Sequence, residues 1–157
     1  MNIERERTAV VAEAMTWLGT NYHAHARIKG VGVDCAQFVL GVYTVALGIT
    51  EPEIPPYAID WFMHSSQEKY LEGLAPYMME RSHLPPDALP GDLVLFRFGR
   101  ANSHAGIVTA WPEFVHADRQ IGKVTLDSLE DGQPYRARLS GVFTLLRWQK
   151  VKRAVQR

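Results

Sequence analysis

Apolar side chains recur at helical spacing in two stretches of the first half of the chain. In residues 3–18 they form one stripe, and Gly19 marks its end. In residues 35–47 they fall at i, i+3, i+4, i+7, i+8, i+11 and i+12, and Gly48 follows. Each stretch therefore predicts a helix with one face buried against a core.

The second helix also has a defined start. Asp34 is a preferred N-cap residue, and Gln37 lies three positions later. At this spacing the two side chains can exchange hydrogen bonds with each other's backbone N–H, an arrangement called a capping box. The pattern therefore makes Cys35 the first residue of the helix.

The sequence between residues 51 and 90 is less regular. EPEIPP at 51–56 predicts a rigid turn, residues 58–79 predict one or two helices, and RSHLPPDALP at 81–90 predicts a proline-rich connection. An insertion between residues 51 and 89 carries four aromatic side chains: Trp61, Phe62, Tyr70 and Tyr77. We expect these side chains to belong to the core, with the lining of a cleft as the alternative.

From residue 91 onward the chain changes to short β-rich segments separated by turn residues. The predicted strands are 92–98, 103–110, 113–117, 123–126 and 142–148. Helices that precede strands joined by short connections predict an α+β fold on an antiparallel sheet. We expect one domain, residues 1–157, with a helical part at about 1–80, a sheet part at about 91–148 and a basic tail at 149–157.

Composition narrows the possible functions. The chain has 157 residues, 17 basic and 17 acidic side chains, and no net charge. Because there is no basic excess, we expect no general nucleic-acid binding. The single cysteine, Cys35, excludes an intramolecular disulfide.

The longest apolar stretches, such as residues 38–47, are about half the length needed to cross a bilayer, so no membrane span is expected. The charged start MNIERER is followed by no signal-peptide core. We therefore expect synthesis in the cytoplasm, and delivery by another agent if the protein acts outside the cell.

Cys35 lies where a thiol can become reactive. The unpaired backbone N–H groups and the dipole at a helix N-terminus favour negative charge, so the position predicts a thiol that ionises near neutral pH. A thiolate is the nucleophilic form of cysteine. A cysteine on the apolar face of a helix is also commonly a small buried packing residue, and its position alone leaves both interpretations open.

Two histidines strengthen the catalytic interpretation. His104 begins the segment SHAGIV, and His116 lies in EFVHAD, twelve residues later and across a turn. Side chains alternate along strands, so on adjacent antiparallel strands the two imidazoles would face each other or lie diagonally. One ring could then fix the tautomer of the other beside the thiol.

Four segments, GVDCAQFV, LPGDLVLFRF, SHAGIV and FVHAD, occur in an order and spacing that resemble the NlpC-type cell-wall cysteine peptidases, a papain-like superfamily. The resemblance extends from about residue 22 to residue 126. It implies a papain-like fold in which the nucleophile begins a helix that packs on the sheet. It also implies a peptidoglycan stem peptide as substrate, a thioester acyl-enzyme, and no cofactor.

The resemblance further implies roles for individual residues. Cys35 is the nucleophile, His104 the general base and acid, and His116 the residue that orients His104. Tyr22 is similar to a tyrosine whose hydroxyl assists the backbone N–H of Cys35 in an oxyanion hole. Asp34 is a further candidate for contact with a substrate amine.

Two other classes of function are compatible with these residues. A zinc-dependent hydrolase would use His104 and His116 with Asp118, or His23 with His25, although these spacings match no common zinc signature. A non-catalytic assembly or wall-binding module would leave the three site residues idle. Alkylation of Cys35 at pH 6 would separate such a module from an enzyme with an ionised thiol.

The absence of a signal peptide, taken with the resemblance, suggests a phage-associated enzyme that a phage tail delivers to the wall. Phage tail proteins are then expected partners. His64 and His83 are expected on the surface.

Overall fold

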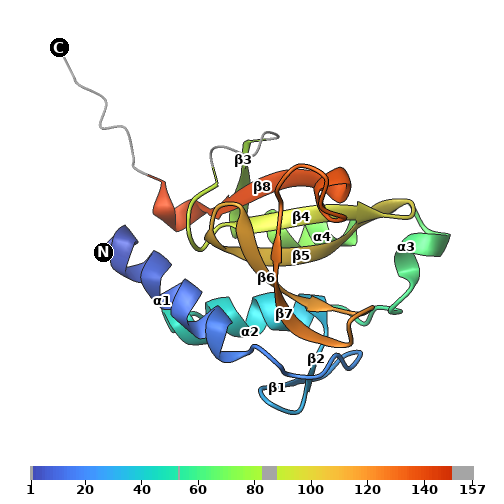
Figure 1. The fold of residues 1–157 in the computed structure, drawn as a ribbon, viewed down its shortest axis with the longest axis horizontal. Helices are drawn as coiled ribbons and strands as arrows, with labels where there is room; N and C mark the ends of the chain where they lie inside the picture. The colour runs from blue at the N-terminus through green and yellow to red at the C-terminus, as the bar shows by residue number, and fades with distance from the viewer. Residues whose placement is uncertain (1, 53, 83–87, 150–157) are drawn as a thin grey trace.

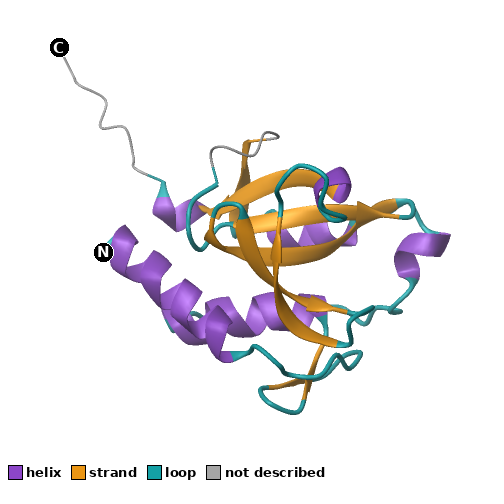
Figure 2. Cartoon of the chain, in the orientation of Figure 1, coloured by secondary structure: helices purple, strands orange, loops and turns teal. Residues whose placement is uncertain are grey.

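The structure, a computed structural model, describes residues 2–52, 54–82 and 88–149. Two helices, α1 (Ile3–Thr16) and α2 (Cys35–Leu47), lie side by side against one face of a six-stranded sheet (Figure 1). Figure 2 shows the same arrangement as a layer of helices beside a layer of strands. The predicted α+β class is therefore confirmed. His83 and residues 150–157 of the predicted basic tail lie outside the described residues.

Both predicted helices form. α1 begins after Asn2, whose side chain accepts a hydrogen bond from the backbone N–H of Arg5. α2 begins at Cys35 and ends at Gly48, which adopts a left-handed conformation with φ of 60°. Glycine adopts this conformation without the steric cost that a Cβ brings, which explains the helix end.

The predicted capping box forms only in part. Asp34 Oδ1 accepts from the backbone N–H of Gln37 at 2.9 Å. The Gln37 side chain instead donates to the hydroxyl of Tyr57 at 3.5 Å, and the Asp34 N–H donates to the carbonyl of Ala26. The hydrogen bond expected between the Asp34 N–H and the Gln37 side chain is thus absent, and each group instead bonds to a residue outside the helix.

The sheet is antiparallel throughout, with strand order β3-β8-β4-β5-β6-β7. Its strands are β3 (Met78–Ser82), β4 (Leu93–Phe98), β5 (Ala101–Ala110), β6 (Glu113–Asp118), β7 (Lys123–Ser128) and β8 (Leu139–Leu145). Short 3₁₀ turns at Arg136–Arg138 and Leu146–Trp148 flank β8, and β1 (Arg27–Ile28) pairs with β2 (Gly32–Val33) in a small ribbon. Five strands overlap predicted segments, although β8 begins before residue 142 and the expected strand residues 146–148 form a 3₁₀ turn. β3 was not predicted, because it begins in the stretch expected to be helical and ends in the stretch expected to be a proline-rich connection.

The segment between α2 and β3 contains two short helices, α3 (Trp61–His64) and α4 (Lys69–Leu74). Two helices agree with the prediction for residues 58–79, except that Met78 and Met79 pair with β8. His64 is exposed, as expected.

The main core lies between the two long helices and the sheet. It contains side chains from α1, α2, β4, β5 and β8, including Val10, Phe38, Val42, Leu93 and Ile107, all fully buried. A smaller cluster around Phe96 and Phe114 covers the other side of β4, β5 and β6. No helix among the described residues is long and apolar enough to cross a membrane.

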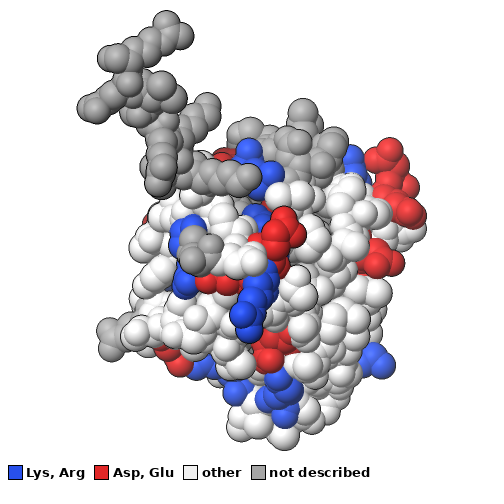
Figure 3. All heavy atoms as spheres, turned by 90° about the vertical axis from the view of Figure 1, so that its left-hand side faces the viewer, with Lys and Arg blue, Asp and Glu red and all other residues white. Residues whose placement is uncertain are grey.

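Basic and acidic side chains are interspersed on the face shown in Figure 3. This mixed distribution accords with the equal numbers of basic and acidic residues in the sequence.

A buried ion pair connects α1 to the turn before β4. Arg7 Nη1 donates to Asp92 Oδ1 at 2.7 Å and to the carbonyl of Pro90, while Asp92 Oδ2 accepts from the backbone N–H of Leu89. Both side chains are almost completely removed from solvent. The aspartate of the LPGDL segment therefore has a structural function.

Replacing Asp92 with alanine is expected to lower the free energy of unfolding by about 3–5 kcal/mol, because the Arg7 guanidinium would stay buried without its counter-ion. Urea denaturation followed by circular dichroism measures the change. Asp131→Ala is the matched control, since the Asp131 side chain is 96% exposed and its ion pair with Arg136 contributes less than about 1 kcal/mol. Equal stability of the two variants would contradict a structural function for Asp92.

Candidate active site

The thiol of Cys35 lies against the backbone on both sides of His104. Its Sγ donates to the carbonyl of Ser103 at 3.8 Å, and the backbone N–H of Ala105 points back toward the sulfur. The thiol is buried, with 9% of the residue exposed. The start of α2 and the middle of β5 therefore bring the predicted nucleophile and the predicted base to the same place.

The insertion covers the thiol from the other side. The hydroxyl of Tyr70, on α4, donates to Cys35 Sγ at 3.2 Å. Tyr70 and Trp61 also line a mostly apolar groove of about 650 Å³ between α2 and the insertion. Tyr70 packs against the main core, as expected, and also lines the groove, which was the alternative. The expectation of a core position is wrong for Tyr77, which is 43% exposed and lines the groove. Trp61 is buried as expected, although it also lines the groove.

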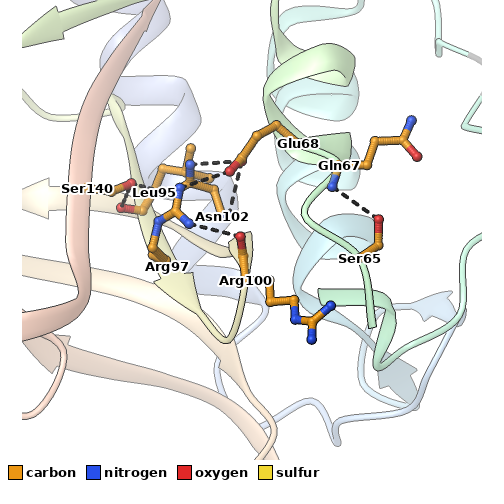
Figure 4. A network of polar contacts seen from close by, with 8 residues as sticks. All are labelled: Ser65, Gln67, Glu68, Leu95, Arg97, Arg100, Asn102 and Ser140. Carbon is orange, nitrogen blue, oxygen red and sulfur yellow. Dashed lines mark hydrogen bonds and ion pairs between the residues drawn. The ribbon is translucent and has the colours of Figure 1, made fainter. Parts of the chain in front are cut away.

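A polar network holds α4 in this position. Glu68 Oε1 forms an ion pair with Arg97 at 3.0 Å, and Glu68 Oε2 accepts from the backbone and side-chain N–H groups of Asn102 (Figure 4). Asn102 also contacts Ser140 on β8. Because Asn102 is two residues before His104, the network fixes the insertion directly to the strand that carries the histidine.

Burial determines the protonation state of the Cys35 thiol. Removal from water, the largest cause, and the nearby Asp34 carboxylate both raise the pKa of Cys35, which is about 12 in the folded protein. The Tyr70 hydroxyl and the backbone N–H groups of Ala36 and Ala105 act in the opposite direction, but more weakly. The expectation of a thiol that ionises near neutral pH is therefore wrong for this resting structure, in which desolvation exceeds the effect of the helix N-terminus.

Alkylation of Cys35 by iodoacetamide is therefore expected to be slow at neutral pH and to rise about tenfold per pH unit toward pH 12, since only the thiolate reacts. A variant that combines Cys35→Ala with Val31→Cys supplies an exposed thiol for comparison, because Val31 is 65% exposed. At pH 7 its rate should exceed that of Cys35 by about a thousandfold, given an ordinary pKa of about 8.5. A Cys35 rate that reaches its plateau below pH 7 would contradict this assignment.

The two histidines are joined directly. His104 Nε2 and His116 Nδ1 lie 2.7 Å apart, so one hydrogen bond connects the rings. Burial lowers the pKa of both imidazoles, and both are neutral at rest. The predicted juxtaposition of His104 and His116 is thus confirmed.

Gly106 allows this close approach of β5 and β6. A Cβ at Gly106 would lie 2.6 Å from the Phe114 ring and 3.2 Å from the Cβ of His116. Any larger residue would push β6 away, which explains why glycine follows two residues after His104 in SHAGIV.

Two carboxylates lie beside His116 Nε2, the ring nitrogen that does not contact His104. Its Nε2 lies 3.3 Å from Asp127 Oδ2 and 3.8 Å from Asp118 Oδ2. Asp127 was not singled out in the sequence. It lies on β7, which pairs with β6 across a short turn and places Asp127 two residues beyond Thr125, the partner of His116. The predicted strand 123–126 ended before Asp127, although the same alternation that placed the two histidines together could have found it.

Within the described residues, His116, Asp118 and Asp127 form the one group whose ligand atoms are close enough to hold a metal ion. His104 does not belong to this group. His23 and His25, the other histidines considered as ligands, are exposed and are not part of such a group.

Tyr22 and Asp34 also lie near the thiol. Burial raises the pKa of Tyr22, with further contributions from Cys35 and Asp34. Asp34 is fully buried, and its carboxylate accepts from the backbone N–H groups of Gln37 and His25 and from the Tyr57 hydroxyl. Asp34 is therefore inaccessible to a substrate amine in this structure, whereas Tyr22 keeps a hydroxyl without a hydrogen-bond partner among the described residues.

Comparison with known proteins shows which family this sequence matches. The sequence model of the NlpC/P60 family matches residues 15–142. The curated protein Murein DD-endopeptidase MepS/Murein LD-carboxypeptidase of Escherichia coli (strain K12) is 29% identical over 129 residues, which are 82% of this chain and 57% of the relative. The chain thus spans somewhat more than half the length of that relative.

Solved structures show the same fold. A protein of Staphylococcus aureus described as similar to lipoprotein, NLP/P60 family, superposes with a TM-score of 0.64 and 21% identity, over 89% of this chain and 41% of that one. An N-acetylmuramoyl-L-alanine amidase of Bacteroides uniformis superposes with a TM-score of 0.60 and 13% identity, over 89% and 98% of the two chains.

Proposed function

Because the chain belongs to the NlpC/P60 family, we propose that it is a cysteine peptidase that hydrolyses an amide bond in the stem peptide of peptidoglycan. The observation that carries the proposal is that Cys35 Sγ lies against the backbone on either side of His104, whose ring is hydrogen-bonded to His116. The Escherichia coli relative is named a murein endopeptidase and carboxypeptidase, which supports the substrate class.

The route of the proton in the reaction follows from the protonation states of Cys35 and His104 before substrate binds. His104 Nε2 is occupied by His116, which leaves His104 Nδ1 to take the proton of the thiol as Sγ attacks the amide carbonyl. Because burial keeps His104 neutral, the ring is ready to accept this proton at pH 7.

The first half-reaction ends when the C–N bond breaks. His104 returns its proton to the departing amine, and the acyl group stays on Sγ as a thioester. In the second half-reaction, His104 takes a proton from water, the resulting oxygen nucleophile attacks the thioester carbonyl, and Sγ leaves and is reprotonated. The products are one amine and one carboxylate.

The negative oxygen that forms during attack needs hydrogen-bond donors. The proposal gives this role to the backbone N–H of Cys35, at the start of α2, and to the hydroxyl of Tyr22, which is near enough to Cys35 to interact with it electrostatically. In the resting structure the Tyr70 hydroxyl donates a hydrogen bond to Cys35 Sγ. This hydrogen bond must break before Sγ can attack the substrate.

Liquid chromatography and mass spectrometry of digested sacculi test the substrate class. The proposal expects stem-peptide fragments with a newly formed amine and carboxylate, and the masses identify the bond as one within a cross-link, within the stem or next to muramic acid. Intact sacculi, together with no change in any defined muropeptide, would show that the substrate class is wrong. Delivery by a phage tail stays a prediction, for which co-purification with virions is the measurement.

A further inference from the structure

The Nε2 atom of His116 is buried without a hydrogen bond of good geometry. The side chain has no exposure to solvent, and no described donor or acceptor satisfies Nε2. The nearer of the two carboxylate oxygens beside it is Asp127 Oδ2 at 3.3 Å. A buried polar group in this state costs free energy, so it needs an explanation.

The positions of the protons on the two imidazole rings determine whether His116 Nε2 is protonated. The 2.7 Å contact between His104 Nε2 and His116 Nδ1 contains one proton when both rings are neutral. For His104 Nδ1 to accept a proton from the thiol, that shared proton must belong to His104 Nε2. His116 Nδ1 is then an acceptor, and the proton of His116 must be on Nε2.

If the tautomers were reversed, His104 Nδ1 would carry a proton and could not act as a base. Whatever holds a proton on His116 Nε2 therefore keeps His104 in its reactive form. The two groups that face Nε2 with negative charge are Asp118 on β6 and Asp127 on β7.

Both carboxylate oxygens of Asp118 already accept hydrogen bonds from other groups. Its Oδ1 accepts from the backbone N–H groups of Gln120 and Ile121, and its Oδ2 accepts from the Tyr135 hydroxyl. Asp127 Oδ1 accepts from the backbone N–H of Ser128 at 2.8 Å, whereas its Oδ2 has no other partner among the described residues than His116. The carboxylate available to hold Nε2–H is thus that of Asp127.

We propose that Asp127 is a positioning residue that extends the catalytic series to Cys35, His104, His116 and Asp127. It holds the proton of His116 on Nε2, and it stabilises the positive charge that the histidine pair gains when the thiol gives up its proton. This inference rests on the proposed function, since it assigns His104 as the base.

The kinetic test uses three substitutions at one position. Asp127→Asn and Asp127→Ala are expected to lower kcat by about tenfold to a hundredfold with KM nearly unchanged, since Asp127 lies at His116 Nε2, whereas His104 contacts Nδ1. Asp127→Glu keeps the carboxylate and should restore part of the loss. Asp131→Asn is the matched control at an exposed aspartate and should leave both constants unchanged.

The pH profile separates positioning from a purely structural function. The titratable groups that face His116 are His104 on β5, Asp118 on β6, Asp127 on β7 and Tyr135 before β8. Removing the Asp127 charge lowers the pKa of the histidine pair, so the acidic limb of kcat/KM should move to lower pH in Asp127→Asn. An unshifted limb together with wild-type kcat would overturn the proposal.

Nitrogen-15 NMR of the histidine rings tests the tautomer without any substrate. In Cys35→Ala, His116 should be protonated on Nε2 and His104 on Nε2, and adding Asp127→Asn should change the His116 tautomer. These spectra keep their meaning even if no peptidoglycan substrate is cleaved. Stoichiometric zinc in the purified protein, lost in Asp127→Asn, would instead assign the cluster to a metal and would also overturn the proposal.

Discussion

Replacing Cys35 with alanine is expected to lower kcat/KM on muropeptides by about 10⁴- to 10⁶-fold, because it removes the sulfur on which the acyl-enzyme forms. The fold should persist, since alanine fits the space of a small buried thiol and α2 keeps its Asp34 cap. Release of product measured by liquid chromatography, with thermal unfolding in parallel, checks both statements.

Cys35→Ser is the informative companion variant. It keeps a hydroxyl that can accept the hydrogen bond from Tyr70, but an alcohol is a far weaker nucleophile at this position than a thiol. It should be nearly as inactive as Cys35→Ala. Turnover by both variants at the wild-type rate would assign the reaction to another group, such as a metal-bound water at the His116 cluster.

Replacing His104 with glutamine should lower kcat by about 10³- to 10⁴-fold, since the side-chain amide cannot take the proton of a thiol whose pKa is about 12. The amide can still contact His116, so the local packing is kept. The acidic limb of the pH profile should also disappear, because the group that titrates in it is gone.

His64→Gln is the matched control for this substitution, because His64 is exposed and lies on the short helix α3. It should retain wild-type activity across the pH range. Similar losses in His64→Gln and His104→Gln would show that the assay reports stability rather than catalysis.

Local sequence signals predicted the parts of the fold that depend on neighbouring residues. The start of α2 at Cys35 and its end at Gly48 follow from a cap, an apolar stripe and a glycine, all within fifteen residues. The juxtaposition of His104 and His116 follows from strand alternation across one tight turn. In such cases the residues that determine the geometry are close together in the chain.

Contacts between distant segments were not predictable in the same way. Tyr70 reaches Cys35 from 35 residues away, and β3 joins the sheet by pairing with β8 near the end of the described chain. Nothing in the local pattern of Tyr70 or of β3 specifies these partners.

Asp127 is a different case, because β7 pairs with β6 across a short turn and Asp127 is closer in the chain to His116 than His104 is. It was missed because the predicted strand 123–126 ended before it.

The protonation state of the Cys35 thiol was also not predictable from the local sequence. A helix N-terminus is visible in the sequence, and it favours a thiolate at Cys35. The burial that raises the pKa of Cys35 comes from packing of β5 and the insertion around it, which only the folded structure reveals. Labelling of Cys35 at pH 6 is therefore expected to be slow in an active enzyme as well as in an inactive module, so turnover is the measurement that distinguishes them.

Trapping of the acyl group with hydroxylamine tests the Cys35 thioester most directly. A thioester reacts with hydroxylamine as well as with water, so a muropeptide digested in its presence should yield a hydroxamate whose share of the product rises with hydroxylamine concentration. Mass spectrometry detects the hydroxamate, and Cys35→Ala should form none. Continued hydrolysis that yields only the free carboxylate at every hydroxylamine concentration would contradict a covalent intermediate on Cys35.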